Sequence, residues 1–542
     1  MATRDEVVAR LTAPGAPYEI GREDVRGQQL EVFTRRQRSL AELVRDSARF
    51  GEREYLVSTD DRVTFTEHHA RVAALATALR EEYAVRPGDR VAICAANRPE
   101  WVVAFWATVC VGAVAVGMNS MWAPGEMRHG LGLSAPRLIF ADARRRALLG
   151  EVDLPVVDLD DDLPVLIARH RGAALPDVPV AEDDPAVILF TSGTSGRPKG
   201  ATHSHRNVIA ALWFHLLNDA VAAELGNPPR DRRFLLATPL FHIAALHNLA
   251  VIRLAVGDTA VVHLGRFDID EVLRLVERER VTNWGAVPTM ISRLVERAER
   301  QGLDDLDLSS LRTISVSSAP SSPTLKDRLR AVLPVAGRTL GTTYGLTESS
   351  CAATLATPAE LLADPQTVGR AVPTMEVEVR GSDGGPLPPG CEGEVHLRGP
   401  LVMLGYWDDP NATAAAMKPE GWFGTGDLGT LRQDGHLYIS SRRSDLILRG
   451  GENVYPAEVE DQLVTHEAVA ECIVMGIPDA DFGEAVAAVV VLHDDAVATE
   501  ADLVEHLRPR LARYKLPTHW VLTATPLPRN ATGKVMRREV AL

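Results

Sequence analysis

The sequence has no excess of positive charge, and this shortage excludes two classes of partner. Of its 542 residues, 58 are Lys or Arg and 73 are Asp or Glu, which gives a formal net charge of −15. Because nucleic acids and anionic membranes attract basic surfaces, neither is an expected partner. An anionic small molecule would have to be bound by local positive charge rather than by the field of the whole protein.

Cysteines are few, and no two of them form a Cys-x-x-Cys pair. The chain has 5 cysteines, dispersed along its length. An odd, scattered set is typical of free thiols in a reducing compartment rather than of a disulfide framework. The first residues, Met-Ala-Thr-Arg-Asp-Glu, do not resemble a secretory signal, and the last, Glu-Val-Ala-Leu, are no peroxisomal address. We therefore expect a cytoplasmic protein.

Long hydrophobic runs are also scarce. Residues 101–118 form an uncharged stretch near the lower length limit for a membrane span. Gly112 and Gly117 interrupt this stretch, and the chain offers no second candidate. We predict instead a buried helix over about 100–111 and a short buried strand at 114–116, with no stable insertion into a membrane.

The length of the chain exceeds that of one ordinary domain. Apolar strand-like runs alternate with helix-like runs, which predicts an α/β fold with parallel sheets covered by helices. The end of the chain predicts a separate α+β unit with helices around 457–465 and 501–512 and strands around 470–475, 485–492 and 519–523. The predicted domains are therefore residues 1–440 and 445–542, joined by a hinge at 441–444.

The richest chemical signal is the segment Thr-Ser-Gly-Thr-Ser-Gly-Arg-Pro-Lys-Gly at residues 191–200. Glycines let backbone N–H groups turn toward an anion, hydroxyls add donors and Lys199 adds charge, so a polyphosphate is the ligand that suits this loop best. A buried strand is predicted before it and a helix from 207 after it, which makes a flexible linker the less favoured alternative. The loop is not a P-loop of NTPases, because Pro198 precedes Lys199.

Further clusters of polar residues and glycines follow. Residues 341–348 read Gly-Thr-Thr-Tyr-Gly-Leu-Thr-Glu, and residues 421–427 read Gly-Trp-Phe-Gly-Thr-Gly-Asp. Glu348 could hold Mg²⁺ near phosphates, and Asp427 could accept both hydroxyls of a ribose. Taken alone, each cluster also fits an ordinary turn or a helix-capping aspartate.

In this order, and together with Arg442–Glu460 and Pro528–Lys534, the clusters resemble the adenylate-forming superfamily in its acyl-CoA synthetase branch. The resemblance covers nearly the whole chain. The form Arg-Gly-Gly-Glu-Asn-Val-Tyr-Pro at 449–456 is similar to fatty-acyl- or aryl-CoA ligases rather than peptide-synthetase domains, and no carrier-protein domain follows it. The resemblance implies a large N-terminal domain of parallel-rich sheets covered by helices and a small, mobile α+β C-terminal domain.

The resemblance also implies a reaction in two steps. A carboxylic acid and ATP with Mg²⁺ would form an acyl-adenylate and pyrophosphate, and the thiol of CoA would then displace AMP. Such chemistry needs alignment of anions and neutralisation of developing charge more than covalent help. The implied partners are a small acid, ATP, Mg²⁺ and CoA, and a homodimer stays open.

For the nucleotide site, the resemblance implies Glu348 as a catalytic residue that holds Mg²⁺, Tyr344 along the adenine, and Asp427 with Arg442 on the ribose. The other implied positions are Thr191, Ser192, Gly193, Thr194 and Lys199 for the β- and γ-phosphates, Thr343 or Thr347 for the α-phosphate, and Ser318, Ala319, Pro320, Thr342 and Gly345 around the nucleotide.

Two further catalytic residues are implied. Lys534 would bridge the carboxylate and the α-phosphate in the first step, a task that suits a compact charge on a long side chain, and His242 would gate the carboxylate. The domain would swing about Ser444 between the two steps. The implied CoA-binding residues are Arg449, Gly450, Gly451, Glu452 and Asn453. The implied acid pocket comprises Trp213, Phe214, Ala244, Ala245, Trp284, Val287 and Ser317.

The pocket residues are mostly apolar, so we expect a hydrophobic monocarboxylic acid: a fatty, aryl or polycyclic acid. Four serines depart from the family pattern: Ser317 and Ser318 stand where two glycines are usual, Ser441 replaces a glycine, and Ser444 replaces Asp or Lys. Extra side chains near the nucleotide could crowd it. A specialised enzyme performing mainly one half-reaction and a non-catalytic binding protein on the same scaffold therefore stay as alternatives, as do luciferase-like oxidation and carrier-protein loading.

Overall fold

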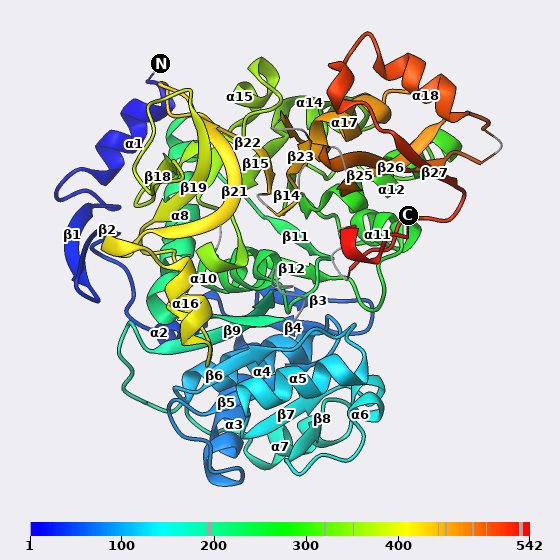
Figure 1. The fold of residues 1–542 in the computed structure, drawn as a ribbon. Coiled ribbons are helices and arrows are strands. Elements are labelled where there is room, and N and C mark those ends of the chain that lie inside the picture. Colours follow the sequence, from blue (N-terminus) through cyan, green and yellow to red (C-terminus); the bar gives the residue numbers. More distant parts are fainter. Residues whose placement is uncertain are drawn as a thin grey trace.

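The computed structural model describes residues 2–191, 198–318, 321–350, 352–442, 444–449, 452–479, 482–494, 496–530 and 535–541. It has the α/β architecture expected from the sequence (Figure 1). Two large sheets with helices against them come first, a smaller antiparallel sheet follows, and the end of the chain forms a sheet of its own.

The first large sheet has the strand order β20-β10-β9-β6-β5-β7-β8. From β9 to β8 all neighbours are parallel, and β10 pairs antiparallel with both β9 and β20. The strands are β5 (Arg90–Cys94), β6 (Val114–Gly117), β7 (Leu138–Ala141), β8 (Val156–Asp158), β9 (Pro185–Thr191), β10 (Lys199–Ser204) and β20 (Gly405–Tyr406).

The second large sheet has the order β17-β16-β15-β14-β13-β11-β12-β3-β4. Its centre from β15 to β3 is parallel, while β4, β16 and β17 are antiparallel at the edges. The strands are β3 (Glu54–Val57), β4 (Arg62–Thr64), β11 (Arg233–Leu236), β12 (Thr259–Val262), β13 (Asn283–Ala286), β14 (Thr313–Ser317), β15 (Gly341–Tyr344), β16 (Thr354–Ala356) and β17 (Arg370–Ala371).

Three smaller sheets complete the fold. One is the hairpin of β1 (Ile20–Val25) and β2 (Gln28–Phe33). The second is antiparallel, with β18 (Glu376–Arg380), β19 (Glu392–Arg398), β21 (Phe423–Leu431) and β22 (Leu437–Arg442). The C-terminal sheet contains β23 (Ile447–Arg449), β24 (Glu452–Val454), β25 (Val469–Asp479), β26 (Gly483–Leu492) and β27 (His519–Thr523).

Helices cover the sheets and fill the space between them. Those before residue 225 are α1 (Arg4–Thr12), α2 (Leu40–Ser47), α3 (Phe65–Glu81), α4 (Pro99–Cys110), α5 (Pro124–Ser134), α6 (Ala143–Leu149), α7 (Asp162–Arg169) and α8 (His205–Glu224). The middle of the chain adds α9 (Ile243–Ala245), the π-helical segment η2 (Leu246–Val251), α10 (Ile252–Val256), α11 (Ile269–Arg278), α12 (Pro288–Gln301), α13 (Pro323–Val332) and α14 (Ala336–Thr339). The last part of the chain has the α-helices α15 (Pro358–Ala363), α16 (Pro410–Ala416), α17 (Pro456–Leu463) and α18 (Glu500–Leu507), preceded by the 3₁₀ turn η3 (Thr347–Ser349).

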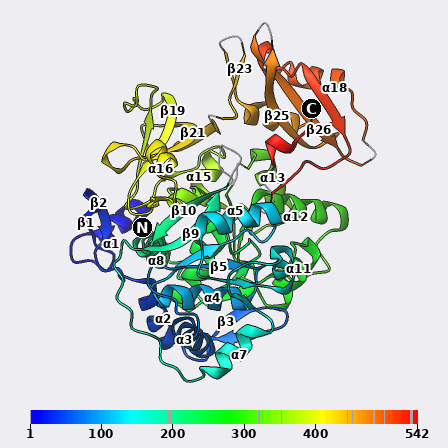
Figure 2. The ribbon, with the colours of Figure 1, turned by 60° about the horizontal axis from the view of Figure 1, so that its bottom comes forward.

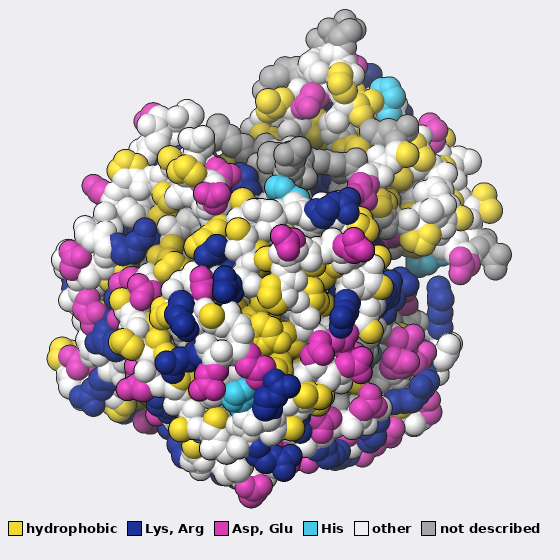
Figure 3. Space-filling view, turned by 90° about the horizontal axis from the view of Figure 1, so that it is seen from below, with side chains coloured by type: hydrophobic (Ala, Val, Ile, Leu, Met, Phe, Trp, Pro, Cys, Tyr) yellow, Lys and Arg dark blue, Asp and Glu magenta, His cyan; other side chains and the backbone are white. Residues whose placement is uncertain are grey.

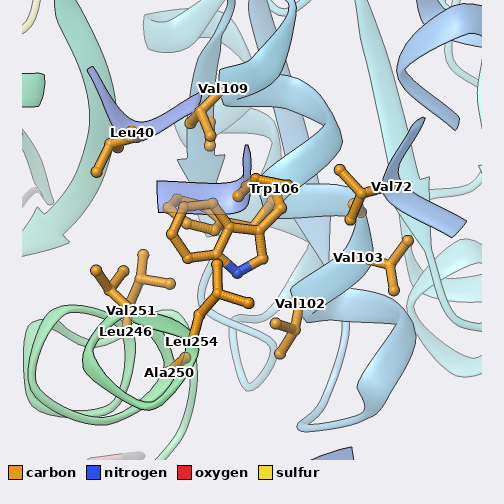
Figure 4. Close-up of a cluster of buried hydrophobic side chains, with 14 of the residues drawn as sticks. Leu40, Val72, Val102, Val103, Trp106, Val109, Leu246, Ala250, Val251 and Leu254 are labelled. Carbon is orange, nitrogen blue, oxygen red and sulfur yellow. The ribbon is translucent and has the colours of Figure 1, made fainter. Parts of the chain in front are cut away.

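The largest hydrophobic cluster lies between the two large sheets. It contains Ile93 of the first sheet and Val262 of the second, with α2, α3, α4 and α8 contributing side chains. Trp106 of α4 lies at its centre, and Leu246 and Val251 of η2 face it (Figure 4). This burial explains the uncharged stretch 101–118, which is α4 followed by β6. None of the helices in the described parts of the chain is long and apolar enough to cross a membrane.

The C-terminal sheet has a hydrophobic core of its own, formed by side chains such as Val459, Val486 and Leu503. Figure 2 shows it with α18 at one corner of the molecule, beyond the large sheets. Among the described residues, contacts that reach across to the rest of the chain include the hydrogen bond from the Tyr455 hydroxyl to the Glu392 carboxylate and the approach of Arg300 to 3.9 Å from Asp494.

Charged side chains of both signs are interspersed over the face in Figure 3, without a dominant basic patch. Some charged side chains are paired inside the protein, such as Arg36 with Glu23 at 2.7 Å and Arg206 with Asp183 at 2.7 Å.

The helix predicted from 207 lies within α8, and a strand that the sequence did not indicate precedes it: Lys199 begins β10, which returns antiparallel along β9 and pairs Lys199 with Thr191. The structure corrects one prediction. The helix expected over 501–512 ends at Leu507, because Pro509 has no backbone N–H with which to continue the helical hydrogen bonds.

Candidate functional site

Three side chains from different strands meet where β15 of the second large sheet ends. Tyr344 ends β15, while Asp427 on β21 and Arg442 on β22 are direct partners in the antiparallel sheet. The Tyr344 hydroxyl donates to Asp427 Oδ2 at 2.7 Å, and Arg442 Nε lies 3.1 Å from Asp427 Oδ1. The Asp427 backbone N–H donates to Thr425 Oγ1 at 3.0 Å, which fixes the turn that carries the carboxylate.

This cluster presents an aspartate prepared to accept further hydrogen bonds. Asp427 is buried, with 5% of its surface exposed. Burial, and then the charge of Asp427, raise the pKa of Tyr344 well above its usual value, so this hydroxyl stays a donor. Each carboxylate oxygen can accept two hydrogen bonds, and one on each is used by Tyr344 or Arg442. The remaining capacity suits a ligand with two neighbouring hydroxyls.

A second cluster links Glu348, Tyr406 and Lys199. Glu348 lies in η3, four residues after Tyr344, and its Oε1 accepts a hydrogen bond of 2.9 Å from the Tyr406 hydroxyl. Tyr406 is on β20, the strand beside β10, and Lys199 Nζ lies 5.0 Å from the centre of its ring. Burial raises the pKa of Glu348 above its usual value, with the charges of Arg442 and Asp427 acting on it as well. The two clusters therefore share one electrostatic environment.

The donor set of this second cluster fits Mg²⁺. Magnesium prefers oxygen ligands and is commonly held by one or two carboxylates together with substrate phosphates. Glu348 supplies such a carboxylate, and its Oε1 is already oriented by Tyr406. The described residues contain no group of three or more His, Cys, Asp or Glu side chains that could hold a metal alone. A magnesium ion here would therefore share its ligands with a phosphate-bearing molecule.

Ser318 has a backbone conformation that is unusual for a residue with a side chain. It follows β14 with φ of 75°, in the left-handed region that favours glycine. A side chain there costs about 1–2 kcal/mol. The neighbouring hydroxyl of Thr342 donates to the Val316 carbonyl at 2.6 Å, so it holds the two strands together.

The predicted acid-pocket residues do not form one group. Trp213 points to the side of β2, where its indole N–H donates to Gln37 Oε1 at 3.0 Å and its ring packs on Phe33. Phe214 belongs to another hydrophobic cluster, with Ala201. Ala245 lies in the same hydrophobic cluster as Trp213. A third cluster contains Trp284 and Val287. The side chains of Ala244 and Ser317 are partly exposed.

His242 lies at the start of α9. Its Nε2 is covered and has no hydrogen-bond partner among the residues that the structure describes, and burial lowers the pKa of this imidazole to about 4. It is therefore neutral at pH 7. The ring contacts that of Phe241, with 4.4 Å between their centres.

The predicted CoA-binding residues belong to a hairpin. Arg449 on β23 pairs with Glu452 on β24, and Asn453 follows on the same strand. Arg449 Nη1 donates to the Tyr514 carbonyl at 2.8 Å, so the side chain of this arginine is held within the C-terminal domain. Ser444, the predicted pivot, is exposed and donates to Asp445 Oδ1 at 3.0 Å.

Several predicted site residues lie outside the described parts of the chain: Ser192, Gly193, Thr194, Ala319, Pro320, Gly450, Gly451 and Lys534. Thr343 directly precedes Tyr344 in the chain. Gly345 and Thr347 lie between Tyr344 and Glu348. Sequence reasoning assigned no role to Tyr406 or Thr425. The Gly-Tyr-Trp of 405–407 carried a signal, but only its position beside β10 reveals the contact with Glu348.

Known proteins share both the fold and the sequence pattern. A feruloyl-CoA synthase of an Amycolatopsis species is 37% identical over 495 residues, covering 88% of this chain and 93% of its own. A long-chain-fatty-acid–CoA ligase of Mycobacterium tuberculosis is 35% identical over 490 residues, covering 89% and 93%. The o-succinylbenzoate CoA synthetase of Bacillus subtilis, solved with its acyl-adenylate intermediate, matches with a TM-score of 0.79 and 31% identity over 92% of this chain and 97% of its own.

Two family descriptions match consecutive parts of the chain. Residues 458–534 match the C-terminal domain of AMP-binding enzymes, and residues 43–407 match the AMP-binding enzyme domain itself. The match over residues 43–407 covers more than half of the chain and includes Tyr344, Glu348 and Tyr406. The chain belongs to the family of AMP-binding enzymes.

Proposed function

We propose that the chain is an AMP-forming acyl-CoA ligase, which activates a hydrophobic carboxylic acid with ATP and transfers the acyl group to CoA. The observation that carries this proposal is the pairing of the Asp427 cluster, suited to a ribose, with Glu348 and Lys199, suited to Mg²⁺ and phosphates. The relatives named above are acid–CoA ligases or synthetases, which supports CoA as the acceptor.

The proposed reaction has two steps. In the first, a carboxylate oxygen attacks the α-phosphorus of ATP, the bond from that phosphorus to the bridging oxygen breaks, and pyrophosphate leaves with the electron pair. In the second, the CoA sulfur gives up its proton to solvent and attacks the acyl carbon. The bond from that carbon to the AMP oxygen then breaks, which leaves a thioester and AMP.

The residues of the site align these anions. Asp427 would accept the two ribose hydroxyls while Arg442 and Tyr344 hold its carboxylate in place. Lys199, and Lys534 from the C-terminal domain, would neutralise charge on the phosphates, and neutral His242 would border the carboxylate. Mg²⁺ held by Glu348 would supply further positive charge during phosphoryl transfer.

The proposal includes a swing of residues 445–542 relative to 1–440 about Ser444. Three features support it: Ser444 is exposed just after β22, the C-terminal sheet has its own core, and the side-chain contacts across the boundary are few among the described residues. The scattered cysteines support a reducing compartment such as the cytoplasm. A homodimer remains a prediction of the sequence alone.

Pyrophosphate exchange and thioester formation test the function separately. The protein is incubated with ATP, Mg²⁺, labelled pyrophosphate and, in turn, an aryl, a fatty and a polycyclic acid, and then with CoA. We expect label in ATP and a thioester with at least one acid. A thioester formed only from preformed adenylate would indicate a specialised enzyme, and the absence of both products across the panel would indicate a binding protein.

Glu348→Gln tests the magnesium site. The amide keeps the shape of the side chain but loses its charge, so Mg²⁺ should no longer increase the affinity for ATP, while ATP binding without Mg²⁺ should change little. We expect adenylation to fall about 100-fold or more, the size typical of one lost electrostatic contact in the transition state. Calorimetric titration of ATP with and without Mg²⁺ gives the binding measurement.

Two tyrosines provide a matched comparison for this prediction. Tyr406→Phe removes the hydroxyl that orients Glu348 and should weaken the Mg²⁺ effect about 10-fold, as expected for a residue behind a metal ligand. Tyr438→Phe removes a hydroxyl that bonds Asp364 at 2.7 Å, away from this cluster, and should leave it unchanged. Equal effects of both changes would contradict the assignment.

A further inference from the structure

Two buried histidines meet at one serine behind the proposed site. His203 lies on β10, His247 on the π-helical segment η2, and Ser350 follows η3 with φ of 56°. The two rings are nearly perpendicular, with 5.1 Å between their centres. All three residues have no exposed surface, so segments far apart in the sequence build this cluster inside the protein.

The hydrogen bonds of the cluster define what each ring can still do. His247 Nδ1 lies 3.1 Å from the Ser350 carbonyl oxygen, and because a carbonyl only accepts, Nδ1 is the donor. The Nε2 of His247 is therefore a bare acceptor. His203 Nδ1 lies 2.8 Å from the Ser350 hydroxyl, which can donate to it and so leave the proton of this ring on Nε2.

Both Nε2 atoms are buried and have no hydrogen-bond partner among the described residues, so each ring keeps one unused hydrogen-bonding atom. Burial also lowers the pKa of His247 to about 4 and that of His203 well below its usual value. Both rings are therefore neutral at pH 7 and act as hydrogen-bonding groups rather than as charges.

The cluster adjoins two segments that carry predicted acid-pocket residues, α8 with Phe214 and the segment 242–247 that ends at His247. Ala201, on the same face of β10 as His203, packs in one cluster with Phe214 of α8 and with Ala352, which follows Ser350. On η2, Leu246 and Val251 face Trp106 (Figure 4), and this core contact anchors η2. The same segment carries His247, which is hydrogen-bonded to the Ser350 carbonyl. A π-helical turn is a costly feature that is frequent at functional sites.

We propose that His203 and His247 form the polar end of the acid pocket and bind a hydroxyl group at the far end of the substrate. This inference rests on the proposed acyl-CoA ligase function and narrows its substrate to an acid with a terminal or ring hydroxyl distant from the carboxylate. A hydroxyl can donate to His247 Nε2 and accept from His203 Nε2–H at the same time. A methyl group of similar size can do neither, and a ketone can only accept.

Matched pairs of acids test the inference on the unmodified enzyme. Each pair has the same length and differs in a hydroxyl or a methyl at the far end: 4-hydroxycinnamate with 4-methylcinnamate, and 12-hydroxydodecanoate with tridecanoate. Because sites built to bond a hydroxyl reject analogues without it strongly, we expect kcat/KM for thioester formation to favour the hydroxyl acid about 100-fold or more in the better pair. Equal or better use of the methyl acid in both pairs would overturn the inference while leaving the ligase function intact.

Substitutions then assign the preference to the two rings. His203→Leu and His247→Leu should each bring the hydroxyl-to-methyl ratio of kcat/KM at least about 10-fold closer to one, as expected for one lost hydrogen bond. His68→Leu is the matched control, because His68 is also buried with unpaired ring nitrogens but lies against Tyr55 in the core. A ratio that moves equally in the control, or not at all in the two variants, would refute the assignment. Failure of every acid in wild type would instead refute the ligase function.

Discussion

Asp427→Asn should lower kcat/KM for ATP about 1000-fold, because two charge-assisted hydrogen bonds of about 1.5–3 kcal/mol each depend on this carboxylate. An amide has one oxygen and one NH₂ group in place of two oxygens. It cannot accept from Tyr344, from Arg442 and from both ribose hydroxyls together. The loss should appear in pyrophosphate exchange and in the affinity for ATP. Thioester formation from a preformed adenylate should weaken as well, because the adenylate carries the same ribose.

Asp434→Asn is the control for this prediction. Asp434 lies in the turn between β21 and β22, is exposed, and accepts a hydrogen bond from the His436 backbone N–H at 3.1 Å. The same chemical change there should leave the kinetics of ATP unchanged. If Asp427→Asn retained more than a tenth of the wild-type kcat/KM with an unchanged melting temperature, the ribose role would have to be abandoned.

The fold was largely predictable where strand and helix patterns are strong. The helix expected over 100–111 is α4 (Pro99–Cys110), and the strand expected over 519–523 is β27 (His519–Thr523). β10 was missed because Lys-Gly-Ala-Thr-His-Ser contains few residues that favour strands. It is a strand because β9 and β20 flank it on both sides, which is a tertiary effect.

The site was predictable as a set of segments but not as a network. The resemblance indicated Tyr344, Glu348 and Asp427, yet no local pattern links Glu348 to Tyr406, or His203 to Ser350. Those hydrogen bonds join the segment around η3 to β20 and β10, strands that are distant from it in the sequence. The sequence did not indicate that Trp213 and Phe214, adjacent on α8, face different hydrophobic clusters, and the acid pocket stays a prediction.

The protein should lose stability steeply as the pH falls from 6.5 toward 5. Burial lowers the pKa of His68 to about 3, those of His205, His215, His242 and His247 to about 4, and that of His203 well below its usual value. Above pH 6.5 these rings are neutral in both the folded and the unfolded chain, so they have no effect on the pH dependence. Below pH 6.5 the unfolded chain binds protons that the folded chain excludes, and each histidine lowers the free energy of unfolding by about 1.4 kcal/mol per pH unit.

Buried carboxyl groups oppose part of this effect. Burial raises the pKa of Asp461 to about 6 and raises those of Glu348 and Glu460, so these groups bind protons on folding and favour the folded state as the pH falls. More histidines have a lowered pKa than these carboxyl groups have a raised one, so unfolding takes up protons overall and the free energy of unfolding falls as the pH drops below 6.5. With a typical stability of 5–15 kcal/mol, unfolding should occur within a few pH units below 6.5.

Denaturant unfolding at several pH values between 7.5 and 5 measures this slope. His68→Leu should make it about 1.4 kcal/mol per pH unit shallower, because one excluded proton is removed. The same substitution at His519, exposed on β27, should keep the wild-type slope. His203→Leu and His247→Leu should each flatten the slope as His68→Leu does, yet only these two should alter the choice between hydroxyl and methyl acids. The pH slope therefore reports burial, and the substrate ratio separates a binding histidine from a structural one.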